Sequence, residues 1–238
     1  MIEVSELTVR FGGVTSLDGM SVRFEAGTCG LIGPNGAGKT TFFNVLSGFV
    51  RPAEGHVRAF DEDLLSMAHF RRARWGLRRT FQTEQAIESL SVYDNVALVH
   101  EHSKLGRANR RGEVLDAIEF VGLRDVAYVK VGTLGVGSRR LVEVARAVVG
   151  KPRLVLLDEP AAGLPDAETA HLGELIRRIP EHSEALTILV DHDMSLVSSC
   201  CPVTAVLDFG KMIASGPTAD VLRNEQVVRA YLGAEEFQ

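Results

Sequence analysis

The 238-residue sequence is poor in cysteine, and its three cysteines do not suit a disulfide framework. Their number is odd, and Cys200 and Cys201 are adjacent, where a mutual bridge would be strained. The sequence contains no C-x-x-C pair, which argues against a structural zinc site. We expect Cys29, Cys200 and Cys201 to be small buried hydrophobic residues in a reducing compartment.

The sequence also lacks a long apolar run. No stretch approaches the roughly 18 uninterrupted apolar residues that suggest a membrane-spanning helix. The first residues do not combine a basic segment with an apolar run, as a signal peptide does. The net charge is −5, with 31 acidic and 26 basic residues, which does not suit a nucleic-acid binder. We expect a cytosolic protein without a nucleic-acid partner, while docking on a membrane protein stays open.

The first part of the chain predicts a hairpin followed by a strand, a glycine-rich turn and a helix. Near-alternating apolar residues over 4–11 and a second run over 20–24 predict the hairpin. An apolar run over 29–32 precedes the glycine-rich turn, and residues 39–46 are helical in character. Residues 51–60 predict a turn and another edge strand.

The remainder predicts a helical middle and a return to alternating strands and helices. Helical periods over 113–121 and 139–149 indicate a mostly helical insertion at about 85–150. The uninterrupted apolar run over 154–157 is typical of a strand buried on both faces of a parallel sheet. Further elements are predicted as a helix that ends at Pro180, strands at 186–190, 203–208 and 212–214, and a helical tail at 219–232.

Residues 33–40 fit the pattern G-x-x-x-x-G-K-[ST] at every fixed position. Glycines allow the backbone N–H groups to point inward as an anion-binding nest, and the following helix adds its positive N-terminal end. Lys39 supplies a charge for the β- and γ-phosphates, and Thr40 offers a hydroxyl to a Mg²⁺ that bridges them. A chance match in such a chain has a probability on the order of one in a hundred. We therefore predict a nucleotide site formed by Gly33, Pro34, Asn35, Gly36, Ala37, Gly38, Lys39, Thr40 and Thr41.

Polar side chains follow two of the later predicted strands. Asp158 and Glu159 come directly after the run over 154–157, where α/β sheets place ligand-binding groups. Asp158 would hold Mg²⁺ and Glu159 would polarise an attacking water, although both could merely begin the next helix. His192 follows the strand at 186–190 and could contact a γ-phosphate, whereas a lone histidine there is usually structural or exposed.

In this order and spacing, and together with Gln82, these elements resemble the ATP-binding subunits of ABC transporters over essentially the whole chain. The resemblance identifies a Q-loop glutamine at Gln82, a Walker B segment at 154–159 and an H-loop histidine at His192. It implies an α/β fold, namely a P-loop NTPase core with a mixed sheet and an antiparallel β subdomain, plus a helical signature subdomain. The single ABC domain would consist of a core at 1–84 and 151–238 with the helical subdomain at about 85–150.

The resemblance also implies ATP and Mg²⁺ as cofactors and assigns roles to residues. Glu159, His192 and Gln82 would be catalytic, and the metal would be held by Thr40, Gln82 and Asp158. Phe11 occupies the position of an aromatic residue that stacks on adenine, or it is a core residue of its strand.

Finer features resemble the importer ATPases for branched-chain amino acids or related amides and urea. They are FGGVTSLDGMSVRF, LRRTFQ, DEPAAGL, DHDMSLV and a terminal RAYLG. The implied partners are transmembrane permease subunits, a second ATP-binding subunit and, indirectly, an extracytoplasmic solute-binding protein. The chain would then sit at the cytoplasmic face of the membrane, with the segment near 82–95 against the permease. Five arginines would face the permease or anionic lipid, or else form a solvated basic helix: Arg71, Arg72, Arg74, Arg78 and Arg79.

Two segments depart from the family pattern. The signature, LSGGQ or LAYGQ in this branch, is here Leu134-Gly135-Val136-Gly137-Ser138, without the usual serine and glutamine. Pro165 stands where aspartate or asparagine is usual. We hypothesise an asymmetric heterodimer in which this chain hydrolyses ATP and lends its partner a weakened signature. The alternative is a catalytically weak, nucleotide-binding regulatory subunit.

Overall fold

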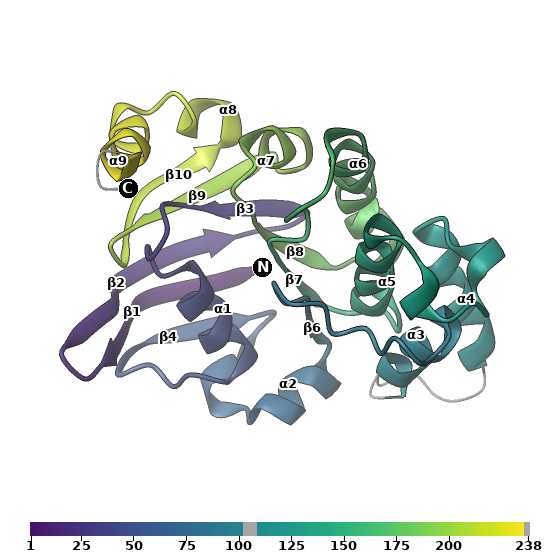
Figure 1. Cartoon of the computed structure of the whole chain (residues 1–238). Helices are drawn as coiled ribbons and strands as arrows, with labels where there is room; N and C mark the ends of the chain where they lie inside the picture. Colours follow the sequence, from purple (N-terminus) through teal and green to yellow (C-terminus); the bar gives the residue numbers. More distant parts are fainter. Residues whose placement is uncertain (102–108, 236–238) are drawn as a thin grey trace.

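The computed structural model describes residues 1–101 and 109–235 and contains two β-sheets (Figure 1). The smaller sheet is antiparallel and has the order β2-β1-β4-β5. Its strands are β1 (Ile2–Phe11), β2 (Val14–Phe24), β4 (Glu54–Ala59) and β5 (Glu62–Asp63). The predicted hairpin is confirmed. The strand predicted within 51–60 is β4, which is not at the edge, because the two-residue β5 pairs with its outer side.

The larger sheet is mixed and has the order β10-β9-β3-β8-β7-β6. Only β10 is antiparallel to its neighbour. The strands are β3 (Thr28–Ile32), β6 (Leu77–Arg79), β7 (Leu154–Asp158), β8 (Leu186–Val190), β9 (Val203–Asp208) and β10 (Lys211–Pro217). The carboxyl ends of the parallel strands meet at one edge, which is where such sheets bind ligands.

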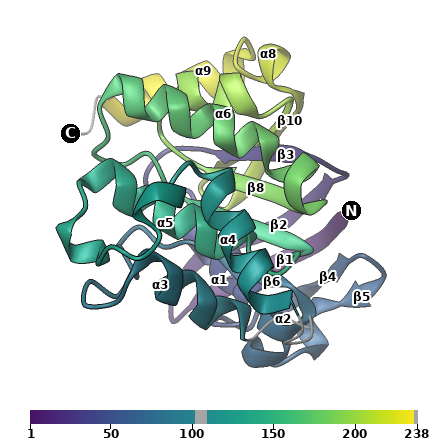
Figure 2. The same ribbon diagram turned by 90° about the vertical axis from the view of Figure 1, so that its right-hand side faces the viewer.

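Nine α-helices are described in residues 1–101 and 109–235. They are α1 (Lys39–Ser47), α2 (His69–Trp75), α3 (Val92–His100), α4 (Arg110–Phe120), α5 (Val136–Val148), α6 (Asp166–Ser183), α7 (Met194–Cys200), α8 (Thr218–Val221) and α9 (Glu225–Glu235). Figure 2 brings α3, α4 and α5 to the viewer's side, where they form the helical part between β6 and β7. One prediction was wrong, because α6 continues through Pro180 to Ser183. The tail is helical as predicted and consists of two helices, α8 and α9.

Strand β7 divides its side chains between two hydrophobic cores. Val155 and Leu157 face the core that contains α5, α6 and α7, and Leu154 and Leu156 face the core shared by both sheets and α1. All four are 0% exposed, so this run is buried on both faces as predicted. The cysteines are free and buried, as predicted. Within the described ranges, no helix combines the length and apolar character that crossing a membrane requires.

Three of the five predicted surface arginines are buried, which corrects that interpretation. Arg72 donates to the Leu46 carbonyl at 2.8 Å, and Arg78 donates to the Ala73 carbonyl at 2.6 Å. Arg79 pairs with Asp158 at 2.8 Å, with both side chains at most 5% exposed. Only Arg71 and Arg74 are exposed. The basic segment is not one helix either, because α2 ends at Trp75 and β6 follows.

Candidate nucleotide site

The glycine-rich loop between β3 and α1 is held against the rest of the core by its backbone. Gly33 has φ +152° and Gly38 has φ +108°, and an added Cβ would lie 2.0 Å from the Leu207 carbonyl and 2.6 Å from the Ser16 carbonyl respectively. Only glycine fits this approach. The Ala37 carbonyl also accepts a bond from the Gly210 amide at 2.9 Å. Neighbouring strands therefore determine the shape of the loop.

Lys39 lies under this loop and is 6% exposed. Its Nζ donates to the carbonyls of Gly33 at 2.6 Å and Pro34 at 2.9 Å. Burial lowers the pKa of Lys39, while the nearby charges of Glu159 and Asp158 act in the opposite direction. The amine is thus placed beside the loop by protein carbonyls, which a stronger anionic partner can replace.

A pocket of about 300 Å³ joins the loop to three residues from distant parts of the chain. Gln82, Glu159 and His192 line it together with loop residues and Ser16 of β2. The lining residues of the loop are Asn35, Gly36, Ala37, Gly38, Lys39, Thr40 and Thr41. Thr41 Oγ1 lies 2.7 Å from Ser16 Oγ. The structure therefore brings together most of the residues predicted for the site.

Glu159 and His192 contact each other across this pocket. His192 Nε2 lies 2.9 Å from Glu159 Oε1, and their side chains are 44% and 19% exposed respectively. Glu159 has φ +48°, which is uncommon for a residue other than glycine and marks local strain. Its amide donates to the Val190 carbonyl at 2.7 Å, which ties this strained residue to the end of β8. Two adjacent strand ends thus fix the pair.

Asp158 lies beside the pocket but does not line it. Its side chain is 2% exposed, its Oδ2 accepts from Arg79, and its Oδ1 has no hydrogen-bond partner among the described residues. Burial raises the pKa of Asp158, and the bond from Arg79 opposes this rise. Sequence reasoning missed Arg79 as a partner, because a basic run usually indicates a surface.

Asp191, which the sequence places directly after a predicted strand and before His192, is 5% exposed. Its Oδ2 accepts from the Ala161 amide at 3.3 Å and its Oδ1 from the Asp193 amide at 3.0 Å. Burial raises the pKa of Asp191, and these backbone bonds partly offset the rise. The side chain braces the two loops that carry Glu159 and His192.

Two predicted elements lie outside this pocket. Phe11 is 51% exposed at the hairpin end, so the core interpretation of this residue is wrong and its adenine role stays a prediction. The signature segment begins α5, with Gly135 as an N-cap that offers no side-chain bond and Val136 47% exposed. Gly137 and Ser138 line a separate pocket with Leu164 and Glu168.

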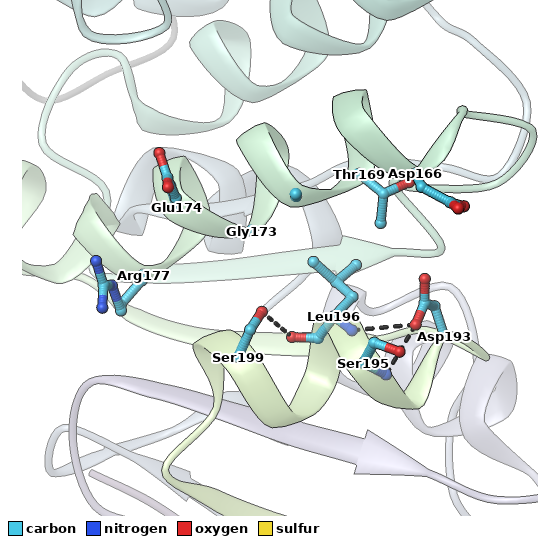
Figure 3. Close-up of a pocket in the computed structure, with 10 residues that line it drawn as sticks. Asp166, Thr169, Gly173, Glu174, Arg177, Asp193, Ser195, Leu196 and Ser199 are labelled. Atoms are coloured by element: carbon cyan, nitrogen blue, oxygen red, sulfur yellow. Dashed lines mark hydrogen bonds between the residues drawn. The ribbon is translucent and has the colours of Figure 1, made fainter.

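Another cleft lies away from the predicted site. It has a volume of about 630 Å³ and lies between α6 and α7 (Figure 3). Within it, Asp193 Oδ1 accepts from the amides of Ser195 and Leu196 at 2.8 and 3.1 Å, which caps α7. None of the predicted catalytic or phosphate-binding residues lines this cleft.

Comparison with known proteins places these features in a family. Residues 17–162 match the family described as "ABC transporter", and residues 211–236 match "Branched-chain amino acid ATP-binding cassette transporter". The chain is 36% identical to the high-affinity branched-chain amino acid transport ATP-binding protein BraF of Pseudomonas aeruginosa, covering 98% of both chains. It is 34% identical to LivG of Escherichia coli, also over 98% of both. A crystal structure of the ADP conformation of an ATP-binding cassette of an ABC transporter superposes with a TM-score of 0.86, at 25% identity and 98% coverage of both chains.

Proposed function

This chain belongs to the ABC transporter family of ATP-binding cassettes, and from this premise we propose that it binds and hydrolyses ATP to drive solute import. The solute would be a branched-chain amino acid or a related small polar molecule, which is supported by the names of BraF and LivG. The observation that carries the proposal is the pocket that joins Lys39 and the glycine-rich loop to Gln82, Glu159 and His192.

Each residue of this pocket would have its own role in the transfer of the γ-phosphoryl group to water. The loop amides and Lys39 would hold the β- and γ-phosphates and stabilise their developing charge. Glu159 would orient the attacking water and accept its proton. His192, paired with Glu159 at 2.9 Å, would keep that carboxylate in position and contact the γ-phosphate. The inward-facing pair therefore supports hydrolysis more than binding alone.

The donor atoms around the pocket suit a magnesium ion that is held mainly by phosphate oxygens and water. Thr40 and Gln82 supply neutral oxygens, and Asp158 supplies a buried carboxylate with one unpartnered oxygen. Mg²⁺ prefers oxygen ligands and usually takes few of them from the protein. When bound, the ion would neutralise phosphate charge during transfer.

The permease would dock on an apolar groove of about 520 Å³ beside the Gln82 segment. Phe49 and Phe70 are 59% and 50% exposed in this groove, which also includes Phe81 and Leu98. Exposed aromatic side chains of this kind are typical of protein interfaces. Docking there would hold the chain at the cytoplasmic face of the membrane and link it indirectly to an extracytoplasmic solute-binding protein.

A second ATP-binding subunit would complete the site, because the signature segment does not reach this chain's own pocket. The altered Gly135 and Ser138 support an asymmetric pair, in which this chain hydrolyses ATP while its signature serves the partner poorly. They also favour the alternative of a regulatory subunit with little turnover. Glu159→Gln in this chain, compared with the equivalent change in the partner, separates the two. A larger loss of ATPase activity in this chain supports the asymmetric pair, and equal losses overturn it.

Purified chain provides the direct test of the proposed function. We expect magnesium-dependent binding of ATP and release of phosphate, measured by isothermal titration and a phosphate assay. In vesicles with its permease and second cassette, leucine, isoleucine and valine are compared with urea as transported solutes. Absence of magnesium-dependent affinity for ATP would contradict the proposal.

A further inference from the structure

The segment from Gln82 to Glu88 joins the core to the helical part without forming a helix or strand. Just before it, the chain is bonded to the core. The Thr80 amide donates to the Leu156 carbonyl at 2.9 Å, and the Asp158 amide donates to Thr80 Oγ1 at 3.0 Å. From Gln82 onward, the bonds to other elements involve the helical part instead. Between Thr80 and Gln82, the hydrogen bonds of the chain therefore change from the core to the helical part.

Helix α5 holds this segment with side chains spaced along one face. Arg140 Nη1 donates to the Gln82 carbonyl at 3.4 Å. One turn later, Glu143 Oε1 accepts from the Gln85 amide at 3.0 Å. Residues three apart on a helix lie on the same face, so the two contacts act side by side. The helix that begins with the signature segment is thus hydrogen-bonded to the segment that carries Gln82.

Glu143 makes two of the polar contacts that connect α5 to its surroundings. Its side chain is 8% exposed, and the oxygen that accepts from Gln85 also accepts from Arg146 Nη1 at 2.9 Å. Arg146 in turn lines the apolar groove. Loss of either partner would leave the buried Glu143 carboxylate with an unfavourable desolvation energy. The carboxylate, the Gln85 amide and the Arg146 guanidinium are therefore held together. Glu143 therefore connects the Gln82 segment, α5 and the groove.

Asn95 of α3 fixes the far end of the same segment. Its Oδ1 accepts from the Ile87 amide at 2.7 Å and its Nδ2 donates to the Ile87 carbonyl at 3.0 Å. Asn95 is 1% exposed. Gln85 and Ile87 are thus both bonded to helices of the helical part, whereas Thr80 is bonded to β7.

We propose that Glu143 is a positioning residue that makes the Gln82 segment move together with α5. A displacement of the signature end of α5 then changes the position of Gln82 at the nucleotide pocket and of Arg146 at the groove. This inference rests on the proposed function for its consequence, namely coupling between ATP and the permease. The physical link itself is a property of the chain alone.

Hydrogen exchange on the purified full chain tests the link without any partner. In Glu143→Ala, the Gln85 amide loses its acceptor, and we expect it to exchange about tenfold faster. Glu143→Gln keeps an amide oxygen as acceptor and should restore part of the protection. Glu119→Ala, which removes an exposed glutamate of α4 paired with Arg124 at 3.8 Å, is the control and should leave Gln85 unchanged.

The consequence is tested in the complex of this chain with its permease and second cassette. Glu143→Ala should reduce permease-stimulated ATPase activity by about tenfold while the Kd for magnesium-ATP stays within about twofold, because the residue lies outside the pocket. Unchanged exchange at Gln85 in the alanine variant overturns the link. Faster exchange with unchanged stimulation overturns the positioning role. If the wild-type chain binds no ATP, the proposed function is contradicted. The hydrogen-exchange test of the link can still be interpreted, because it does not depend on ATP.

Discussion

Two helix starts in this molecule, those of α1 and α5, have the same local chemistry and different surroundings. Each follows a glycine N-cap that makes no side-chain bond, so each exposes amides at the positive end of a helix. Around α1, the chain supplies Lys39, Glu159 and His192 within one pocket. Around α5, the first helical residue is the 47% exposed Val136.

The difference teaches that the start of α1 has a cation within its own pocket, whereas the arginines near the start of α5 are bonded elsewhere. Arg139 pairs with Glu84 at 3.4 Å, and Arg140 donates to the carbonyls of Gln82 and Ala162. The start of α1 is enclosed by strands from both sheets, which fix the backbone of the glycine-rich loop. At α5, the carboxylate of the exposed Glu168 lies close to Gly137. A phosphate group bound at the start of α5 therefore needs further ligands from another chain, whereas a phosphate group at the start of α1 does not.

The strongest test of this comparison removes the lysine in the pocket at the start of α1. In Lys39→Ala, we expect ATP turnover to fall by a factor on the order of a hundred or more, because phosphate charge loses its main protein counterion. Turnover and nucleotide affinity are measured on purified chain. Lys211→Ala is the matched control, since Lys211 is 65% exposed and pairs with Asp18 at 3.1 Å. Equal activity of the two variants would refute the assignment of the site.

The same glycine-to-alanine change should destabilise the protein far more at the start of α1 than at the start of α5. In Gly38→Ala, φ of +108° and a Cβ 2.6 Å from the Ser16 carbonyl should lower the free energy of unfolding by about 3 kcal/mol. In Gly137→Ala, the Cβ meets only the end of the flexible Glu168 side chain, at 2.2 Å. That carboxylate can turn away, so we expect a change within about 1 kcal/mol. Urea denaturation measures the free energy of unfolding of both variants. Similar decreases in this free energy would mean that the start of α5 is as enclosed as the start of α1.

The contrast also explains what the sequence could predict. The glycine-rich loop is a local pattern, and β7 is recognisable from its uninterrupted apolar run, so both were predictable. Gln82 was identified only through the family resemblance, because it has no local signal of its own, whereas His192 was already a candidate from its position after a predicted strand. Arg79 was placed wrongly, since its partner Asp158 is 79 residues away and only folding brings the two together.

A gain-of-function change at α5 tests whether its bare start limits activity. Gly135→Ser adds a hydroxyl at the N-cap, where it can donate a charge-assisted hydrogen bond to phosphate worth about 1.5–3 kcal/mol. Because this segment serves only the partner's site, turnover is measured in pairs whose other site is silenced by Glu159→Gln in this chain, and we expect it to rise by about tenfold, a factor that corresponds to roughly 1.4 kcal/mol. The isolated chain should bind ATP as before, because Gly135 lies outside its pocket. An unchanged rate in the pair would show that the backbone amides of α5 suffice.

The comparison extends to acidic side chains, because the α1 side contains the buried Asp191 whereas the α5 side has the exposed Glu168. Burial raises the pKa of Asp191 above its usual 3.8, so the folded state binds this proton more strongly than the unfolded state does. The contribution of the carboxyl group to stability is therefore full below about pH 3.8 and is lost as the pH rises through the raised pKa. Asp191→Asn is neutral throughout and keeps one acceptor oxygen for the amides of Ala161 and Asp193. We expect the free energy of unfolding of the variant, relative to wild type, to increase between pH 4 and pH 7. Urea denaturation across this range measures the difference, and a constant or decreasing difference would show that the buried carboxylate costs the α1 side nothing.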